Sequence, residues 1–167
     1  MILAVCGYGT HGKGTFCQLL AGLTTLRYTQ STSEAAAEVV FAAIGTRYGY
    51  ANSHECWLDR RNHRAEWFDI IREYNKPDGM TLYREMLKTQ DILEGIRDSF
   101  ELRTLKEAGL VQKSVWISAE KRLPPELIAS NNVTQDDCDA WVGNNGTRRE
   151  FIQKVQEFID FYGLERK

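Results

Sequence analysis

The sequence predicts an α/β domain in which helices cover a mainly parallel sheet of five strands, arranged as a three-layer sandwich. Two observations carry this prediction. The chain opens on a continuous apolar run, Ile2 to Cys6, which is typical of a strand covered on both faces. Further short apolar runs then alternate with segments of helical periodicity, as they do in parallel sheets with helical crossovers.

The elements expected after the first strand follow in order. A glycine-rich turn leads into a helix whose apolar residues lie at helical spacing, namely Phe16, Leu19, Leu20 and Leu23. Further strands are expected at residues 26–30, 91–96, 114–118 and 140–143, and further helices at 31–44, 54–74, 81–89, 99–108 and after residue 147. Ser31 with Glu34, and Thr147 with Glu150, have the spacing of a capping box. Gly109 is expected to end the helix that precedes it.

Length and composition favour one globular domain spanning residues 1–167. Of the 167 residues, 43% are hydrophobic and 26% are charged, as in ordinary globular proteins. The formal net charge of −2 excludes a strongly basic protein that coats nucleic acid, so no nucleic-acid partner is expected. We interpret residues 31–90 as a helical substrate-binding insertion and residues 119–139 as a short lid-like segment.

The cysteines and the hydropathy pattern favour a cytoplasmic protein without a membrane partner. The four cysteines form no Cys-x-x-Cys pair, and scattered thiols of this kind are typical of a reducing compartment. No apolar run approaches the roughly 18 residues of a membrane span. The apolar start of the chain lacks the basic region of a signal peptide, so we expect a strand there.

Residues 7–15, Gly-Tyr-Gly-Thr-His-Gly-Lys-Gly-Thr, carry the clearest chemical signal. Gly7, four further residues and then Gly12-Lys13 match the spacing of a phosphate-binding loop. Such a loop needs glycines because several main-chain N–H groups must converge on the phosphate oxygens. The helix that begins near Lys13 points its positive end at the same anion. A glycine-rich turn that merely joins strand to helix is the alternative interpretation.

All residues of this loop except Tyr8 are candidates for the site. The residues expected to bind the phosphates of ATP are Gly7, Gly9, Thr10, His11, Gly12, Lys13, Gly14 and Thr15. Lys13 would place its charge on the β- and γ-oxygens, and the hydroxyl of Thr15 would help to hold Mg²⁺. Gly14 stands where the usual pattern has Ser or Thr.

The Gly-Lys-Gly-Thr form is similar to the loop of adenylate kinases, with Gly9 and Thr10 in place of their Pro and Gly. The whole chain resembles the deoxynucleoside monophosphate kinases of bacteriophages. The segments that carry the resemblance occur in the family's order and are CGYGTHGKGT, STSEAAAEVVF, DRRNHRAEW, DILEGIR, VWISAEKRLPP and GNNGT. It implies a P-loop sandwich with five parallel strands. It also implies an ATP-dependent kinase that phosphorylates a deoxynucleoside monophosphate with Mg²⁺, in the host cytoplasm if the chain is phage-encoded.

Acceptor-binding residues are expected in the helical insertion. Arg60, Arg64 and Trp67 follow i, i+4, i+7 spacing and so share one face of the expected helix 54–74. Two guanidinium groups beside an aromatic ring can hold a 5′-phosphate and stack on a base. A solvated face paired with carboxylates is the alternative. The residues that close the second expected strand are further candidates for acceptor contacts, or serve only as helix caps: Ser31, Thr32 and Ser33. His63 is expected as a weak substrate contact.

Charged residues also end two of the expected strands, at the edge where open α/β sheets bind ligands. Arg97 resembles the arginine of the adenylate-kinase pattern Asp-Gly-x-Pro-Arg, which grips the acceptor phosphate; an ion pair with Asp98 or Glu101 is the alternative. Glu94 replaces the acidic residue of that pattern and is expected to orient a Mg²⁺-bound water. Arg122, and less strongly Lys121, are expected as cations at the transferring phosphate; simple surface charge is the alternative.

The expected catalytic residues are therefore Lys13, Arg97 and Arg122. In related kinases the loop after the last strand lies beside the adenine of ATP, which implies that role for Asn145 and Gly146. A kinase with another acceptor, such as dephospho-coenzyme A, remains an alternative because the GNNGT stretch resembles the end of those kinases as well. A regulator that holds a nucleotide without turnover is a second alternative, favoured by the short lid. The sequence leaves open the accepted base and a homodimer.

Overall fold

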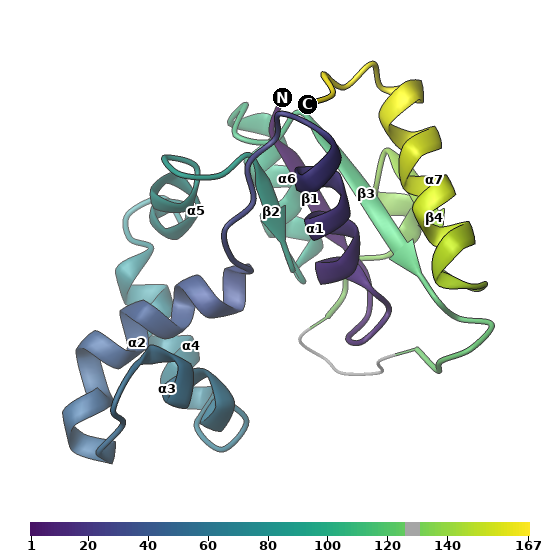
Figure 1. The fold of residues 1–167 in the computed structure, drawn as a ribbon. Coiled ribbons are helices and arrows are strands. Elements are labelled where there is room, and N and C mark those ends of the chain that lie inside the picture. The colour runs from purple at the N-terminus through teal and green to yellow at the C-terminus, as the bar shows by residue number, and fades with distance from the viewer. Residues whose placement is uncertain (126–130) are drawn as a thin grey trace. The chain divides into compact units, whose positions relative to one another are not determined.

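The computed structural model describes residues 1–125 and 131–167. The chain divides into two compact units, one formed by residues 1–29 and 89–167 and the other by residues 30–88. The first unit is an α/β structure and the second is helical (Figure 1). The helical unit spans nearly the same residues as the insertion expected from the sequence.

The first unit is built on a parallel sheet whose four strands, in the described part of the chain, run in the order β2-β1-β3-β4. The strands are β1 (Leu3–Cys6), β2 (Ile92–Glu94), β3 (Lys113–Ser118) and β4 (Ala140–Gly143). Val5 pairs with Glu94, and Ser118 pairs with Gly143. The carboxyl ends of all four strands therefore meet at one edge, and the predicted parallel α/β fold is confirmed.

The second of the five predicted strands, at residues 26–30, is wrong. This segment runs beside the start of β2, and the main-chain N–H of Asp91 donates to the carbonyl oxygen of Arg27 (2.8 Å). Two of its N–H groups bond to side chains: Arg27 N donates to Asp91 Oδ2 (2.8 Å), and Thr29 N donates to Gln90 Oε1 (3.4 Å). Since side chains take the place of a ladder partner, residues 26–30 have an irregular path.

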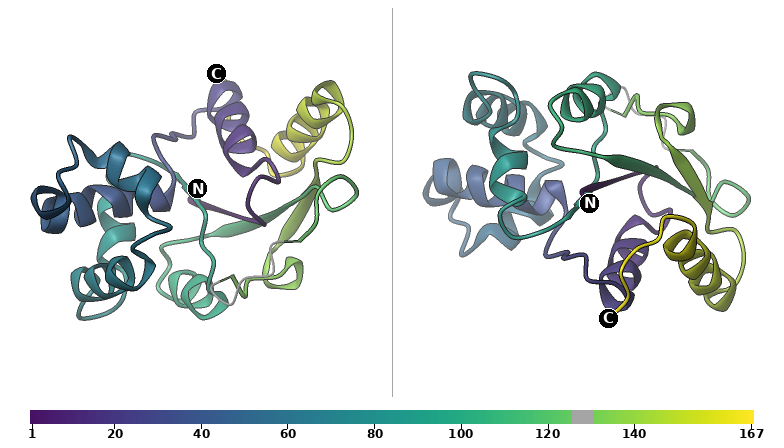
Figure 2. Two further views of the ribbon diagram at one scale, coloured as in Figure 1. Left: turned by 90° about the horizontal axis from the view of Figure 1, so that it is seen from below. Right: turned by 90° about the horizontal axis from the view of Figure 1, so that it is seen from above.

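Helices cover both faces of this sheet, as the left view of Figure 2 shows. Helices α1 (Lys13–Leu23) and α7 (Arg148–Phe161) lie on one face, and α6 (Ser99–Glu107) lies on the other. The core between the sheet and helices α1 and α7 contains alternate residues of the strands together with residues of these two helices, among them Leu3, Val5, Phe16, Leu20, Val115, Ile117, Val155 and Phe158. A short 3-10 helix, η1 (Gln135–Asp137), precedes β4.

The helix ends follow the predicted caps. Ser31 Oγ accepts from the N–H of Glu34 (3.3 Å), whose carboxylate accepts from the N–H of Ser31 (2.8 Å). The same reciprocal pair joins Thr147 and Glu150. Gly109 has a φ of 71° just after α6, a left-handed conformation that favours glycine. These local signals define where three helices begin or end.

The second unit consists of α2 (Thr32–Tyr48), α3 (Ser53–Asp59), α4 (Arg64–Tyr74) and α5 (Thr81–Met86). Its hydrophobic cluster is small: Val40, Ile44 and Cys56 are buried, and neighbours that include Trp67 pack against them. Within residues 1–125 and 131–167, no helix combines the length and the apolar character needed to span a bilayer.

The single helix predicted over residues 54–74 is wrong, because the chain breaks between α3 and α4. The carboxylate of Asp59 accepts hydrogen bonds from Tyr50 Oη (2.6 Å), from the side-chain amide of Asn62 and from His63 Nε2 (3.0 Å). These bonds stabilise a turn that competes with a continuous helix. Arg60 consequently caps α3 while Arg64 begins α4, so the expected common helix face does not form.

Candidate functional site

The loops that leave the four strands gather the sequence-predicted residues of the first unit at one edge of its sheet. Residues 7–12 follow β1, residues 95–98 follow β2, residues 119–125 follow β3 and residues 144–147 follow β4. Because the strands are parallel and in register, these loops share the carboxyl edge, where open α/β sheets bind their ligands.

The loop after β1 depends on its glycines. The φ angles of Gly7 and Gly12 are 138° and 101°, and both lie in the region that strains a residue with a Cβ. A Cβ on Gly7 would lie 2.4 Å from the carbonyl oxygen of Ile117, and a Cβ on Gly12 would lie 2.4 Å from Asn144 Nδ2. The loop is thus packed against β3 and the loop after β4, and Gly12 leads directly into α1.

Lys13 folds back over this loop. Its Nζ donates to the carbonyl oxygen of Tyr8 (2.8 Å), and the residue is only 9% exposed. A buried ammonium is stabilised by such partners and further by an anion. The positive end of α1 begins at the same place and adds to the attraction for negative charge. The first turn of α1 therefore concentrates positive potential beside a narrow main-chain loop.

Thr15 and Glu94 supply oxygen atoms near this turn. Thr15 is exposed on the first turn of α1, and the carboxylate oxygens of Glu94 lie 3.7 Å from the place that a Cβ on Gly14 would occupy. The hydroxyl of Tyr28 donates to Glu94 Oε2, which fixes the carboxylate. Hydroxyl and carboxylate oxygens suit Mg²⁺. The described residues contain no cluster of three or more His, Cys, Asp or Glu that would hold a metal ion.

The turn after β3 and the loop after β4 border a hollow of about 440 Å³. Arg122 donates from both Nε and Nη2 to the carbonyl oxygen of Asn144 (2.9 and 2.7 Å), and Lys121 N donates to Asn145 Oδ1 (3.0 Å). The hollow is lined by residues of α1, α7 and these loops, namely Thr15, Gln18, Arg122, Asn144, Gly146, Arg148 and Phe151. Arg122, expected at the transferring phosphate, thus borders the same space as Gly146, expected beside adenine.

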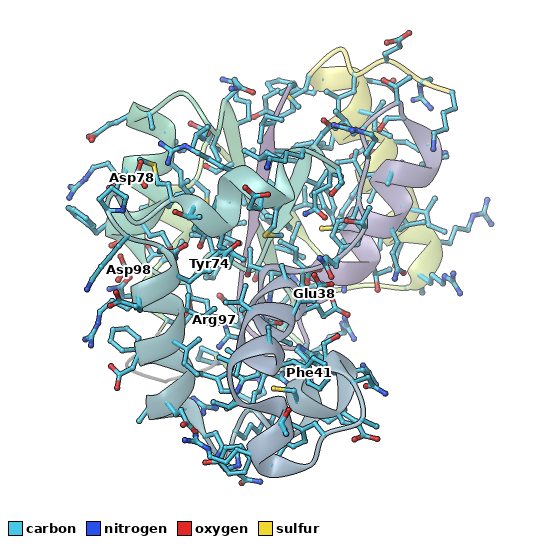
Figure 3. The ribbon with its side chains drawn as sticks, turned by 90° about the vertical axis from the view of Figure 1, so that its left-hand side faces the viewer. Glu38, Phe41, Tyr74, Asp78, Arg97 and Asp98 are labelled. Atoms are coloured by element: carbon cyan, nitrogen blue, oxygen red, sulfur yellow. The ribbon has the colours of Figure 1, made fainter. Side chains whose placement is uncertain are left out.

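Arg97 also lies at this edge, between β2 and α6 (Figure 3). It is half-buried, and its carbonyl oxygen accepts from the N–H groups of Asn132 (2.9 Å) and Val133 (3.2 Å). The neighbouring Asp98 caps α6, because Oδ1 accepts from the N–H of Glu101 (2.9 Å) and Oδ2 accepts from Asn132 Nδ2 (3.2 Å). Arg97 is therefore held by its main chain on the segment that precedes a capped helix.

The side chain of His11 points away from solvent. It is completely buried and bonds to the turn after β3, and the N–H of His11 donates weakly to the carbonyl oxygen of Tyr8 (3.4 Å). The sequence pattern placed His11 among the phosphate-binding residues. The structure gives its imidazole a different set of partners, which lie 108 and 113 residues further along the chain.

In the helical unit, Trp57, which the sequence pattern did not indicate, connects three of the predicted acceptor residues. Its indole Nε1 donates to Ser33 Oγ (3.0 Å), which lies 3.1 Å from Ser31 Oγ. The guanidinium carbon of Arg60 lies 4.2 Å from the centre of a Trp57 ring, and Arg60 Nη1 donates to the carbonyl oxygen of Trp57 (2.7 Å). The i, i+3 spacing of an aromatic residue and an arginine is the signal that would have indicated this pair.

The other predicted residues of this unit have separate environments. Arg64 is exposed at the first residue of α4, and Trp67 packs against the small apolar core. His63 lies beside Asp59 and the ring of Tyr48. Hydrogen bonds from Tyr50 and Asn62 lower the pKa of Asp59, and burial together with its hydrogen bond to Asp59 raises the pKa of Tyr50 to about 12. These groups stabilise the turn between α3 and α4.

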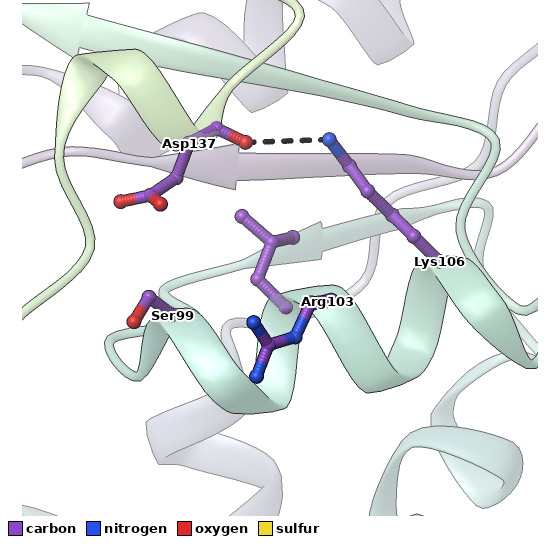
Figure 4. Close-up of a pocket in the computed structure, with 5 residues that line it drawn as sticks. Ser99, Arg103, Lys106 and Asp137 are labelled. Atoms are coloured by element: carbon purple, nitrogen blue, oxygen red, sulfur yellow. Dashed lines mark hydrogen bonds between the residues drawn. The ribbon is translucent and has the colours of Figure 1, made fainter.

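A second hollow, of about 260 Å³, lies beside α6 (Figure 4). Lys106 Nζ donates to the carbonyl oxygen of Asp137 (3.3 Å) and pairs with the carboxylate of Asp139 (3.1 Å). Its positive charge is therefore already balanced by a carboxylate. Because α6 covers the face of the sheet opposite α1, this hollow is separate from the loop after β1.

No protein-family model matches the chain, and no curated protein matches it in sequence. The chain has a parallel α/β unit with a glycine-rich loop and a lysine at the carboxyl edge of its sheet. A helical unit is inserted in the sequence between β1 and β2.

Proposed function

We propose that the chain is a phosphotransferase that moves the γ-phosphoryl group of ATP to a deoxynucleoside monophosphate. The observation that carries the proposal is the glycine loop of residues 7–12, which leads into α1 and is covered by the ammonium of Lys13. Main-chain N–H groups, a helix N-terminus and a lysine at one place favour a phosphate chain over other ligands. A P-loop fold is part of this proposal.

The donor nucleotide is assigned to the first unit. Its phosphates would lie along residues 7–15, and its base would enter the hollow bordered by Arg122 and Gly146. A volume of about 440 Å³ falls within the range of roughly 300–1,000 Å³ that is usual for small-molecule sites. The sequence predicted Arg122 at the transferring phosphate. Because Arg122 borders the same hollow as Gly146, we place it on the base side instead and leave Lys13 to supply charge at the transferred group.

The chemistry needs positioning and charge neutralisation more than a reactive side chain. Thr15 and, through water, Glu94 are the residues that would hold Mg²⁺, which neutralises charge on the β- and γ-phosphates when it is bound. Tyr28 would keep the carboxylate of Glu94 in place. The ammonium of Lys13 would neutralise the charge that develops on the γ-oxygens.

Acceptor binding is assigned to Arg97 in the first unit and to five of the six predicted residues of the helical unit, namely Ser31, Thr32, Ser33, Arg60 and Arg64. Among these, Arg60 is supported best, because Trp57 fixes its guanidinium by stacking and by a hydrogen bond. A guanidinium held in this way loses little conformational entropy when it binds phosphate. Trp67 belongs mainly to the core, so Trp57 takes its place as the aromatic neighbour of the phosphate ligand.

A product assay with ATP, Mg²⁺ and each common deoxynucleoside monophosphate tests the proposal. We expect a diphosphate product from at least one of them, and its identity would name the accepted base. The absence of any diphosphate would contradict the proposal. Dephospho-coenzyme A belongs in the same panel, because its phosphorylation in place of a nucleotide would indicate the alternative acceptor.

A nucleotide-binding regulator is the second candidate, and one observation favours it. Residues 119–139 contain only two cationic residues, Lys121 and Arg122, and Arg122 is bonded to the carbonyl oxygen of Asn144. Little additional positive charge is therefore available from this segment at the transferred group. ATP binding without a diphosphate product from any acceptor would support this second function.

A further inference from the structure

The imidazole of His11 joins the loop after β1 to the turn after β3. The N–H of Ala119 donates to Nδ1 (3.0 Å), and Nε2 lies 3.2 Å from the carbonyl oxygen of Pro124. Because Nδ1 accepts a hydrogen bond, the proton resides on Nε2, which then donates to Pro124. A single neutral, completely buried ring thus holds both ends of the turn formed by residues 119–124.

This turn carries Arg122. The N–H groups of Arg122 and Leu123 both donate to the carbonyl oxygen of Ala119 (2.8 and 2.9 Å), so the turn is closed on itself above the imidazole. The guanidinium of Arg122 then bonds to the carbonyl oxygen of Asn144. Asn144 Nδ2 completes a circuit by donating to the main-chain oxygen of His11 (3.0 Å). His11 therefore bonds through its ring to one loop and through its main chain to the other.

We propose that His11 is a positioning residue that sets the spacing between the glycine loop and Arg122, and hence between the phosphate side and the base side of the nucleotide site. This inference rests on the proposed function. A ligand that reaches both sides, such as ATP, depends on that spacing. A ligand that reaches only the glycine loop, such as inorganic tripolyphosphate, does not.

The two hydrogen bonds of the ring have unequal weight. Ala119 is completely buried, so its N–H has no water to replace Nδ1, and a buried donor without a partner is costly. Pro124 is exposed, so we expect the loss of the hydrogen bond to its carbonyl oxygen to cost less. An asparagine at position 11 places an amide oxygen near the position of Nδ1, whereas a glutamine places its amide near the position of Nε2. His11→Asn should therefore preserve the circuit that His11→Gln breaks.

The test is a calorimetric titration of the wild type, His11→Gln and His11→Asn with ATP and with tripolyphosphate, both with Mg²⁺. For His11→Gln we expect the Kd of ATP to rise about 10-fold or more while the Kd of tripolyphosphate changes less than about 3-fold. For His11→Asn both values should stay within about 3-fold of the wild type. Val155→Ala is the matched control: Val155 is completely buried in the core beneath α7, so its truncation lowers stability without touching this circuit.

Several outcomes overturn the inference. If His11→Gln weakens the binding of ATP and of tripolyphosphate equally, the imidazole acts on the glycine loop alone. If it weakens the binding of neither ligand, the imidazole has no positioning role. If Val155→Ala also weakens the binding of ATP but not that of tripolyphosphate, the selective effect is explained by general destabilisation. If His11→Gln does not fold, His11→Asn provides the test. An increase of more than about 10-fold in its Kd for ATP, with the Kd for tripolyphosphate unchanged, would contradict the role assigned to Nδ1. A wild type that binds neither ligand would overturn the proposed function itself.

Discussion

The two units hold their candidate site residues in different ways. In the first unit, Lys13 and His11 are buried, and their side chains bond to main-chain groups of neighbouring loops. In the helical unit, Arg64 is exposed, and Trp57 is only half-buried and bonds to a serine hydroxyl. The hydrophobic core beneath α1 and α7 is also far larger than the cluster around Val40 in the helical unit.

This difference indicates where binding geometry is preformed. Hydrogen bonds to main-chain groups beside a large core leave the glycine loop little freedom, so the proposed donor side should be organised before a ligand arrives. Contacts among partly exposed side chains are individually weak, so the proposed acceptor side should gain much of its order from the ligand. Substitutions in the first unit should therefore have the larger effects.

Removal of the Lys13 ammonium should have the largest effect. Lys13→Ala is expected to lower turnover about 10²-fold or more, because charge that develops on the phosphoryl group loses a preorganised partner. Initial rates of diphosphate formation measure this loss, and a thermal melt of the variant checks that it remains folded. Normal turnover by a folded variant would place the phosphate site elsewhere.

Two glycines test the preformed loop directly. Gly7→Ala should destabilise the protein by about 1–3 kcal/mol through backbone strain alone, and the contact with the carbonyl oxygen of Ile117 adds to that cost. Gly22→Ala is the control, because Gly22 lies within α1 and a Cβ there meets nothing within 4 Å. It should stabilise the protein by roughly 0.5–1 kcal/mol. Urea unfolding measures the free energy of unfolding of both variants. Equal stabilities of the two would contradict the tight packing of the loop at Gly7.

The helical unit should respond more mildly. Trp57→Phe keeps a ring beneath Arg60 but removes the N–H donated to Ser33. The loss of one hydrogen bond predicts an increase of about 3- to 10-fold in the KM for the acceptor, with the KM for ATP unchanged. Trp67→Phe should alter stability and leave both KM values as they are, because Trp67 packs against the core. A change in the KM for ATP alone would contradict this division between the units.

The smallest expected effect is one of pH. Hydrogen bonds from Tyr50 and Asn62 lower the pKa of Asp59 from its ordinary value of 3.8. The folded state thus binds this proton less tightly than the unfolded state, so Asp59 contributes stability above that value and loses the contribution as the pH falls through the lowered pKa. Between about pH 5 and about pH 2, the wild type should lose more stability than Asp59→Asn. Acid unfolding followed by circular dichroism measures the difference, and identical pH profiles would contradict the assignment.

Elements whose own residues determine them could be predicted from the sequence. The strand Leu3–Cys6, the capping boxes at Ser31 and Thr147 and the turn into α1 all depend on neighbouring residues. The predicted strand at residues 26–30 was wrong because Gln90 and Asp91, more than sixty residues away, bond to its main chain. The break after Asp59 likewise depends on Tyr50, nine residues earlier.

The same distinction applies to the candidate site. The spacing of Gly7, Gly12 and Lys13 predicted a loop in which the structure shows both glycines at positive φ. The partners of His11 and Trp57 could not be predicted from the sequence. Ala119 lies 108 residues after His11, and Ser33 lies 24 residues before Trp57. Periodicity along a helix carries no information on contacts of that kind.

The central claim is that main-chain amides of the glycine loop bind the phosphates of ATP. An NMR titration of the ¹⁵N-labelled protein with ATP and Mg²⁺ tests it most directly. The account predicts saturable shifts that are largest for the amides of Gly9 to Thr15. Saturable binding that leaves those amides unshifted, or no binding at all, would contradict it.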